Sequence, residues 1–281
     1  MWNRLVNSWE LVKASYKVLM ADKELVIFPI ISSIGLFIVS LAFLVPMALG
    51  DMFSQIAHDG FGIIPLIIAF AFYIVQYFVI FYCNTALVGA ALIRLRGGDP
   101  TVGDGLRIAS SRFVPLLGYA LIAATVGMIL KALSDKSNGL GRLVINLIGM
   151  AWNIATFLVV PILAVENVGP IEAIKRSVTL LKKTWGEQVA GNFGIGTIFG
   201  ILTFIIILLA LGGAAIGLYF ESIPLLIAFV AVAVVGLMVV GLIQSTLTGI
   251  YVAAVYRYAV DGEVGAGFDP AMIQGAFTPR K

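Results

Sequence analysis

Residues 222–256 read SIPLLIAFVAVAVVGLMVVGLIQSTLTGIYVAAVY, a stretch that lies between Glu221 and Arg257 and contains no charged residue and no histidine. About 20 largely apolar residues are enough for a helix to cross a bilayer. Five stretches upstream have the same character. The sequence therefore predicts an all-α polytopic transmembrane bundle with six spans, at about 25–50, 61–93, 113–130, 143–165, 189–220 and 222–256.

The composition of the whole chain supports this fold class. Of the 281 residues, 60% are hydrophobic and 12% are charged, whereas an ordinary soluble domain is about 25% charged. A soluble core could not cover so much apolar surface, but lipid can surround it. We predict a single transmembrane domain over residues 1–281, with an amphipathic helix at 1–23 and a tail at 257–281. The longest spans exceed a hydrocarbon core of about 30 Å, so we expect them to tilt, kink or project beyond it.

The basic residues predict the orientation of the spans. Of the 18 lysines and arginines, all but Lys131, Lys136 and Arg142 fall in the N-terminal segment, the second and fourth connections, and the tail. Cytoplasmic loops carry the excess of lysine and arginine. We therefore expect both termini in the cytoplasm. The net charge of +3 follows from this topology, so we expect no nucleic-acid partner.

Two cytoplasmic stretches have the pattern of amphipathic helices. The apolar residues of the first recur every three or four positions, at Trp2, Leu5, Trp9, Val12, Tyr16 and Leu19. The second begins at Pro170, which suits a first helical turn, and its stripe is Ile171, Ile174, Val178, Leu181 and Trp185. These helices either lie in the inner leaflet and bind anionic lipid, or are linkers that cover the base of the bundle. The candidate headgroup contacts are Trp9, Lys13, Lys17, Lys175, Arg176, Lys182, Lys183 and Trp185.

The sequence also has the pattern of a threefold internal repeat. Residues 8–13 align with 177–182 without gaps, and residues 172–175 resemble 104–107. The second and sixth spans match at one constant offset, with Thr85, Ala90, Ala91 and Arg94 over Thr248, Ala253, Ala254 and Arg257. Each predicted unit is an amphipathic element followed by a helical hairpin, so the repeats would be parallel rather than inverted.

None of the predicted spans contains Asp, Glu, Lys, Arg or His in its interior. Such residues mark proton relays, ion-coupled transport and voltage sensing, so the sequence argues against those functions. The uncharged polar residues form a candidate intramembrane cluster of Gln76, Asn84, Asn153, Thr156, Gln244 and Thr248. They either line a pore or neutral-solute site, or join helices through hydrogen bonds worth about 0.6 kcal/mol each. The small-xxx-small spacing of Gly196 and Gly200 suits packing within the bundle or a homo-oligomer interface.

The sequence offers little for catalysis or cofactor binding. Cys83, in a span, is the only cysteine, and His58, in the first outer loop, is the only histidine. They do not supply a nucleophile–base pair or the ligands of a metal cluster. We expect no catalytic, cofactor-binding or metal-binding residues. Glu166, at the end of the fourth span, is expected to pair with Lys175, Arg176 or Arg94.

The segment from Pro161 through Glu166 to Trp185 resembles an element of several uncharacterised prokaryotic six-span families. In these, a proline near a span end precedes a Glu, and an Ala-x-Lys/Arg-Ser helix leads to a Trp, as in Ala173–Ser177 here. Residues 8–9, 22–25, 256–259 and 267–270 are similar to one family in particular, catalogued as a domain of unknown function. The resemblance implies a six-span fold and a prokaryotic source, hence the plasma (inner) membrane. It implies no catalytic residues.

Two functional hypotheses follow from these observations. The first is a non-enzymatic scaffold, accessory subunit or lipid-organising module, because charge-free spans lie beneath a basic cytoplasmic face. Its partners would be the lipid bilayer and a second copy of the chain or another membrane protein. The second is a channel or uniporter for a neutral or amphipathic solute, lined by Gln76, Asn84, Asn153 and Gln244. A membrane-bound enzyme ranks third, and it would need converging carboxylates at the inner surface.

Overall fold

The computed structural model of the chain describes residues 2–50, 52–59, 62–185, 194–265, 267–269 and 273, with side chains for all of these except 2–8, 55, 57, 59, 185, 194 and 197. This part of the chain is helical and contains no strand. Six of its segments are long and apolar enough to cross a membrane. The predicted all-α fold is confirmed, and the six candidate helices agree in number with the six predicted spans.

The long helices form three hairpins, and a shorter helix precedes each hairpin. In the first unit, α1 (Trp2–Ala21) and the 3₁₀ turn η1 (Lys23–Val26) lead to α2 (Ile27–Leu49), α3 (Met52–Asp59) and α4 (Ile63–Leu95). In the second, α5 (Val102–Ser111) leads to α6 (Phe113–Lys136), α7 (Leu140–Ala155) and α8 (Val159–Val165). In the third, α9 (Pro170–Trp185) leads to α10 (Gly194–Tyr219) and α11 (Ile223–Asp261). This order agrees with the three predicted units, and the repeat in sequence stays a prediction.

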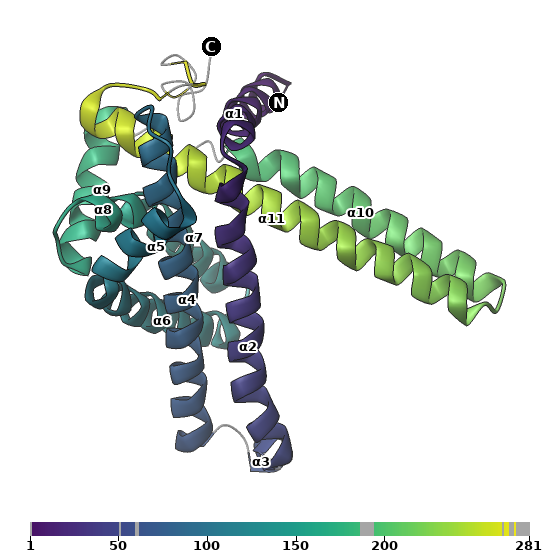
Figure 1. The fold of residues 1–281 in the computed structure, drawn as a ribbon. Coiled ribbons are helices and arrows are strands. Elements are labelled where there is room, and N and C mark those ends of the chain that lie inside the picture. Colours follow the sequence, from purple (N-terminus) through teal and green to yellow (C-terminus); the bar gives the residue numbers. More distant parts are fainter. Residues whose placement is uncertain are drawn as a thin grey trace.

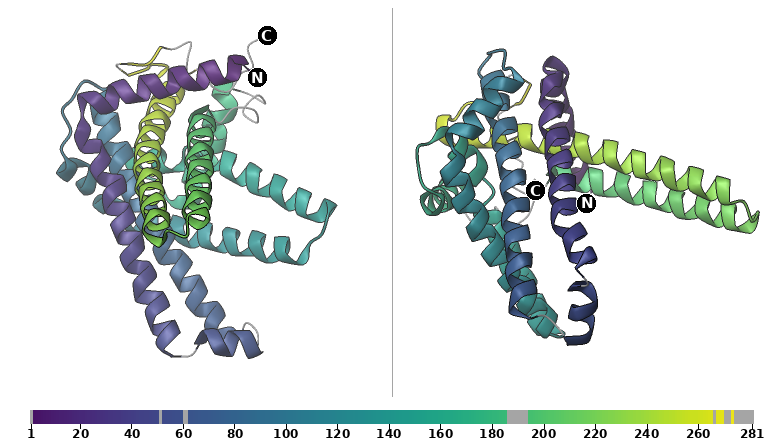
Figure 2. Two further views of the ribbon diagram at one scale, coloured as in Figure 1. Left: turned by 90° about the vertical axis from the view of Figure 1, so that its right-hand side faces the viewer. Right: turned by 60° about the horizontal axis from the view of Figure 1, so that its bottom comes forward.

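The three hairpins converge on one hub and diverge away from it. The pairs α2/α4, α6/α7 and α10/α11 run from the hub in three different directions (Figure 1, Figure 2). We define the hub as α1, η1, α5, α8 and α9, together with the ends of α4 and α11 that pack against them. Helix α4 is its centre, because α4 contacts α2, α5, α6, α8 and α11.

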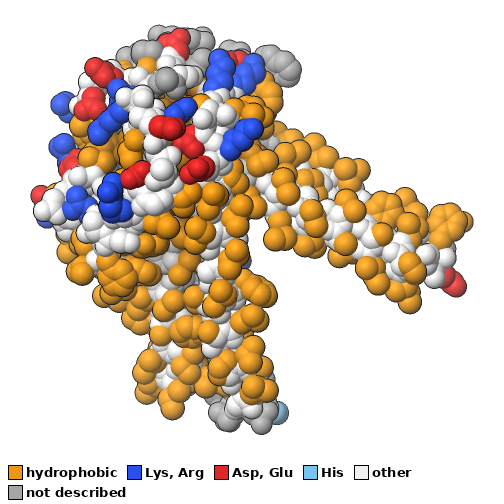
Figure 3. Space-filling model, viewed as in Figure 1, with side chains coloured by type: hydrophobic (Ala, Val, Ile, Leu, Met, Phe, Trp, Pro, Cys, Tyr) orange, Lys and Arg blue, Asp and Glu red, His pale blue; other side chains and the backbone are white. Residues whose placement is uncertain are grey.

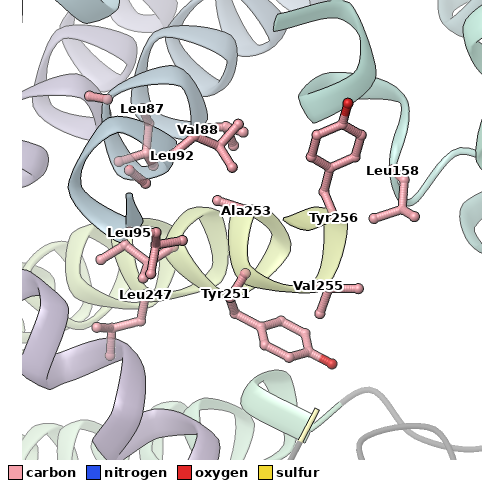
Figure 4. Packing of buried hydrophobic residues seen from close by; sticks show 14 of the residues in the cluster. Leu87, Val88, Leu92, Leu95, Leu158, Leu247, Tyr251, Ala253, Val255 and Tyr256 are labelled. Atoms are coloured by element: carbon pink, nitrogen blue, oxygen red, sulfur yellow. The ribbon is translucent and has the colours of Figure 1, made fainter. Parts of the chain in front are cut away.

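The buried core lies in the hub, where α4 packs against α11. Leu87, Val88 and Leu92 of α4 are buried and lie beside Ala253 of α11 (Figure 4). Gly249 permits this close approach, since a Cβ atom there would lie 2.4 Å from Cδ2 of Leu87. Burying a large apolar side chain contributes about 1.5–3 kcal/mol. The hub, rather than the far ends of the hairpins, therefore holds the protein together.

Beyond the hub, the hairpins present apolar side chains to their surroundings. On the α10/α11 hairpin, Phe204 is 61% exposed and Val232 is 72% exposed. Charged side chains instead gather over the hub (Figure 3). Lys131, Lys136 and Arg142 lie around the tip of the α6/α7 hairpin. Within the described residues, these three basic residues are therefore separated from the basic residues of the hub by the length of the α6/α7 hairpin.

Helix α6 continues to residue 136, beyond the predicted third span of 113–130. Lys131 and Asp135 lie one turn apart and form a 2.9 Å ion pair, which extends the helix beyond its apolar part. Residues 189–193, where the fifth span is predicted to start, lie outside the described residues. Phe61, the predicted start of the second span, also lies outside them.

Helix α11 also continues beyond residue 256, the predicted end of the sixth span. Arg257 remains in the helix, where its guanidinium donates to the carbonyl of Leu95 and forms a 3.0 Å ion pair with Glu263. The helix ends at Asp261, and Gly262 follows with a left-handed φ of 72°. Glycine is the residue that adopts this conformation at a helix C-terminus without steric cost.

The fourth span is broken rather than continuous. One helix is predicted over 143–165, but a turn at 156–158 separates α7 from α8. Pro161 has no N–H with which to bond the carbonyl four residues earlier, so it interrupts the helical ladder. The N–H of Leu158 donates instead to Oγ of Ser177 on α9, at 3.1 Å. Both residues are fully buried.

The glycines of α10 have two different environments. A Cβ atom at Gly217 would lie 2.9 Å from the backbone nitrogen of Leu226, so α10 and α11 approach closely near the hairpin tip. A Cβ atom at Gly196 or Gly200 meets no heavy atom within 4 Å in the described part of the protein. The small-xxx-small pair is therefore not packed against that part, and a homo-oligomer interface there stays a prediction.

Candidate functional site

Two adjoining pockets lie where the hairpins leave the hub. The first, of about 340 Å³, is formed by α4, α8, α11 and the turn that breaks the fourth span. The second, of about 480 Å³, is formed by α2, α4 and α11. Asn84, Gly241 and Ser245 line both pockets. Both volumes lie in the range of small-molecule sites, about 300–1,000 Å³.

Four polar side chains line the first pocket. Asn84 comes from α4, and Gln244, Ser245 and Thr248 come from α11. Gln244 and Thr248 share a face because they are four residues apart on a helix. Within the part of the chain that the structure describes, no hydrogen bond involves any of these four side chains. Asn84, Gln244 and Ser245 are partly exposed, and Thr248 is exposed.

The pockets lie within the spans and contain no charge. Asn84 precedes Arg94 by ten residues, about 15 Å along α4. Thr248 precedes Arg257 by nine residues on α11. Among the residues that the structure describes, no acidic or basic residue lines either pocket. The site can therefore exchange hydrogen bonds with a neutral group, but it offers no counter-ion to a charged one.

The second pocket is mainly aliphatic. Its apolar lining is Pro29, Ile30, Ile34, Leu36, Ile80, Leu237, Met238 and Leu242. Gly241 stands where the two pockets meet, and a Cβ atom there would meet no heavy atom within 4 Å of it in the described structure. Phe157, from the turn in the fourth span, lines the first pocket, and its ring centroid lies 6.2 Å from that of Tyr251. The pair of pockets thus joins a polar end to a hydrocarbon-lined end.

The structure divides the predicted polar cluster. Asn84, Gln244 and Thr248 line the first pocket. Gln76 instead donates from Nε2 to Oγ of Ser40 at 2.9 Å and so joins α4 to α2. Interhelical hydrogen bonding is one of the two roles that the sequence predicts for the whole cluster, and Gln76 has this role.

The two remaining members of the cluster lie in the second hairpin. Asn153 is exposed on α7, and Oγ1 of Thr156 donates to the carbonyl of Trp152 at 2.8 Å. Neither lines the first or the second pocket. Of the four amides predicted to line a channel, only Asn84 and Gln244 therefore come together. Ser245 and Gly241 were missed, although their spacing of four residues places them on one helix face.

The predicted apolar stripe of α1 does not form one surface. Val12 and Leu19 are buried, whereas Trp9 and Tyr16 are about half exposed. The reason is that α1 packs against α10 and α11 through a neighbouring face that includes Leu11, Ala14 and Val18. The exposed aromatics lie on the same side as Lys13, whose Nζ is 5.8 Å from the Trp9 ring centroid. Lys17 is also exposed, and the side chains of residues 2–8 lie outside the described part.

Helix α9 is amphipathic in a similar way. Ala173, Ser177, Leu180 and Leu181 are buried, and α9 contacts α8 and α11. The basic residues Lys175, Arg176, Lys182 and Lys183 are exposed. Ile171, which the sequence assigns to the apolar stripe, is exposed as well, because it lies at the first turn beyond the buried face. The side chain of Trp185 lies outside the described part.

Glu166 joins the second and third units. Of its three predicted partners, Arg176 is the one found, at 3.4 Å. A second partner, Tyr256 of α11, was not predicted, and its hydroxyl donates to Oε1 of Glu166 at 3.1 Å. Arg94 lies elsewhere in the hub, where it donates to the carbonyl of Ala21 at 3.0 Å.

Two carboxyl groups of the hub have shifted pKa values. Burial raises the pKa of Asp22, although the backbone N–H of Glu24 and the charge of Arg94 act in the opposite direction. Oδ2 of Asp22 has no hydrogen-bond partner among the described residues. Asp104 has a lowered pKa because the hydroxyl and backbone N–H of Thr101 donate to its Oδ2, at 2.7 and 3.0 Å, in a capping box.

Among the described residues, no group of three or more His, Cys, Asp or Glu could hold a metal ion.

Comparisons with known proteins place the chain in a family. No curated protein and no solved structure matches the chain. A sequence model described as a family of unknown function, DUF6159, matches residues 63–268, from the start of α4 to beyond the end of α11. This match agrees with the predicted resemblance to an uncharacterised family. The chain therefore belongs to DUF6159, a family of unknown function.

Proposed function

We propose that this protein is a non-enzymatic, lipid-organising module of a prokaryotic plasma membrane, with the hub and both termini on the cytoplasmic side. The observation that carries the proposal is the divergence of three apolar hairpins from one charged hub (Figure 1, Figure 3). Hairpins that diverge leave space between them, and bilayer lipid fills that space. The protein then holds a group of lipid molecules in place of a closed helical core.

Helix α7 supports this proposal most directly, because none of its residues is buried. Leu143 and Val144 are consecutive, so they point to different sides of the helix, and they are 55% and 54% exposed. An apolar helix exposed on different sides is favourable only in a hydrocarbon environment. We therefore expect lipid to surround most of α7.

The basic residues of the hub supply contacts to headgroups. Lys13 and Lys17 on α1 lie beside exposed aromatic residues, a combination typical of helices at a membrane interface. Lys175, Lys182 and Lys183 project from α9. Each basic residue near an anionic leaflet contributes about 1 kcal/mol of binding. The cytoplasmic leaflet is the anionic one, which fits the proposed orientation of the hub.

The test is lipid retention by the full-length protein. The protein is placed in nanodiscs of mixed phosphatidylglycerol and phosphatidylethanolamine, and native mass spectrometry counts the lipids that stay bound. The triple variant K175Q/K182Q/K183Q should retain fewer phosphatidylglycerol molecules than the wild type. The matched variant K175R/K182R/K183R keeps the charge and should behave as the wild type. Equal retention by all three proteins would contradict the proposal.

A second candidate function is a channel or uniporter for a neutral or amphipathic solute. The unpaired amides of Asn84 and Gln244 in one pocket favour it. Proteoliposomes distinguish the two functions, because a uniporter releases an entrapped neutral solute such as glycerol faster than protein-free vesicles do. A lipid-organising module does not change that rate.

A further inference from the structure

The polar groups of the first pocket need a partner that the described protein does not supply. Asn84, Gln244, Ser245 and Thr248 come from two helices and line the same 340 Å³ space. Gln76 shows the contrast, because its amide is bonded across the first hairpin. Asn84, Gln244 and Ser245 are partly exposed and Thr248 is exposed, but at this depth in a membrane there is no water to bond them. The unpaired groups therefore point to an occupant with oxygen or nitrogen atoms.

The absence of charge in both linings defines the head of that occupant. A phosphate at this depth would lie about 15 Å along α4 from the nearest arginine of that helix, Arg94. A charge in the hydrocarbon region without a partner is strongly unfavourable. Hydroxyl, ester and amide groups have no such penalty, and carboxamides and hydroxyls are the groups that bond them.

The second pocket defines the rest of the occupant. Its walls are mainly aliphatic side chains of α2 and α11, among them Ile34, Leu237 and Met238, and Ser32 and Ser33 of α2 line it as well. The two pockets share Asn84, Gly241 and Ser245, so a molecule with its polar group on Asn84 can extend a hydrocarbon chain along α2. An apolar wall beside convergent polar groups is the usual design of a small-molecule site.

We infer that the pocket pair binds one molecule of a neutral, hydroxyl- and ester-bearing lipid of the diacylglycerol class, with its head at Asn84 and a chain along α2 and α11. This inference rests on the proposed lipid-organising function and names a ligand for it. Gly241 is the residue that keeps the two pockets joined, because the space beside it is open. In Gly241→Leu, the new Cβ atom meets no neighbouring atom within 4 Å in the described structure, and the rest of the side chain occupies the space between the two pockets.

The experiment uses a diacylglycerol with a photoreactive group in one chain, incorporated at low density into proteoliposomes of the full-length protein. Wild-type protein should crosslink saturably on α2 and α11, and unlabelled diacylglycerol should compete. Phosphatidic acid with the same chains should not compete, because its phosphate has no counter-ion in the pocket. Competition by phosphatidic acid as strong as that of diacylglycerol would overturn the inference.

Three variants locate the site. Gly241→Leu should lower crosslinking at least about tenfold, which corresponds to about 1.4 kcal/mol. Asn84→Leu keeps the approximate size of the side chain and removes the carboxamide, and it should lower crosslinking by a similar factor. Gly212→Leu is the control, since Gly212 also has open space around its Cβ position but lines neither pocket. Thermal melting in detergent verifies that all variants fold.

The outcomes separate this inference from the proposed function. If Gly241→Leu and Asn84→Leu both crosslink as the wild type does, the pocket pair does not bind the lipid and the inference is wrong. In that case the glutamine variant of α9 can still lose phosphatidylglycerol, and the lipid-organising function stands. If that variant retains phosphatidylglycerol normally, the proposed function fails whatever the crosslinking shows.

Discussion

The hydroxyl oxygen of Ser177 on α9 accepts a 3.1 Å hydrogen bond from the backbone N–H of Leu158, and both residues are completely buried. The bond satisfies a donor that the break in the fourth span leaves free. Irregular backbone at membrane depth is stable only where it is buried in protein or lines a cavity. Here the break places Phe157 in the wall of the first pocket. A helix of the hub therefore fixes the shape of a pocket within the spans.

Replacing Ser177 with alanine should destabilise the protein by about 1–3 kcal/mol, the cost of an unsatisfied buried N–H. Thr179→Ala on the same helix is the control, since Thr179 is exposed and bonds only the carbonyl of Lys175. Denaturant unfolding in detergent measures both. Equal stabilities of the two variants would show that the break does not depend on Ser177.

Gln76 and Asn84 should respond differently to the same substitution, although both are amides of α4. Gln76→Leu removes the bond to Ser40 and should cost about 0.6 kcal/mol. Asn84→Leu removes an amide that has no protein partner in the described structure, so stability should be unchanged or higher. Thermal melting of the two variants in lipid-free detergent checks this. A larger loss for Asn84→Leu would place Asn84 in the packing of the hub.

The close contact of α4 and α11 predicts a second contrasting pair. In Gly249→Ala, the new Cβ atom would lie 2.4 Å from Cδ2 of Leu87, so overpacking should cost about 1–3 kcal/mol. Gly241→Ala on the same helix adds the same methyl group to open space and should have almost no effect. Unfolding midpoints in detergent compare the variants. Tolerance of Gly249→Ala would mean that the two helices are farther apart.

Asp22 predicts a pH dependence of stability. Its pKa is raised by burial, so both the folded and the unfolded protein are protonated below its ordinary value of 3.8. As the pH rises through the raised pKa, the folded protein must ionise a buried carboxyl and loses stability. Asp22→Asn should therefore gain stability relative to the wild type between pH 3 and pH 7. Melting curves across this range test the sign.

Asp99→Asn serves as the control for the pH experiment. The Asp99 side chain is 94% exposed and pairs with Arg94 at 3.0 Å, so the same arginine acts on both carboxylates but only Asp22 is buried. Its difference from the wild type should stay small throughout. A stability gain for Asp22→Asn that is the same at pH 3 and pH 7 would contradict the assignment of the effect to the buried charge.

The spans could be predicted from the sequence because each lacks charge and is bounded by charged residues, as Ser222–Tyr256 is by Glu221 and Arg257. The divergence of the hairpins could not, because it depends on contacts between distant residues, such as Leu87 with Gly249. The break in the fourth span had a local signal in Pro161. The break is stabilised by Ser177, which lies on α9, and the sequence does not show that α9 packs against the break.

The candidate site was predictable only in part for the same reason. Intramembrane polarity identified Asn84 and Gln244, but not that Gln76 is already bonded to Ser40 on α2. In the sequence, an amide that is hydrogen-bonded to another helix looks the same as an amide that is not. Ser245 had no signal strong enough to separate it from other serines of apolar helices. Helix packing decides which of these side chains face a shared space.

The most direct test of the account is the side of the membrane on which α9 lies, because the hub must face the anionic cytoplasmic leaflet. Two proteins that lack the native Cys83 carry a single cysteine each, Lys182→Cys on α9 or Lys136→Cys at the α6/α7 tip. They are treated in intact cells with a membrane-impermeant maleimide. We predict labelling of Lys136→Cys in intact cells and of Lys182→Cys only after permeabilisation. Labelling of Lys182→Cys in intact cells would contradict the account.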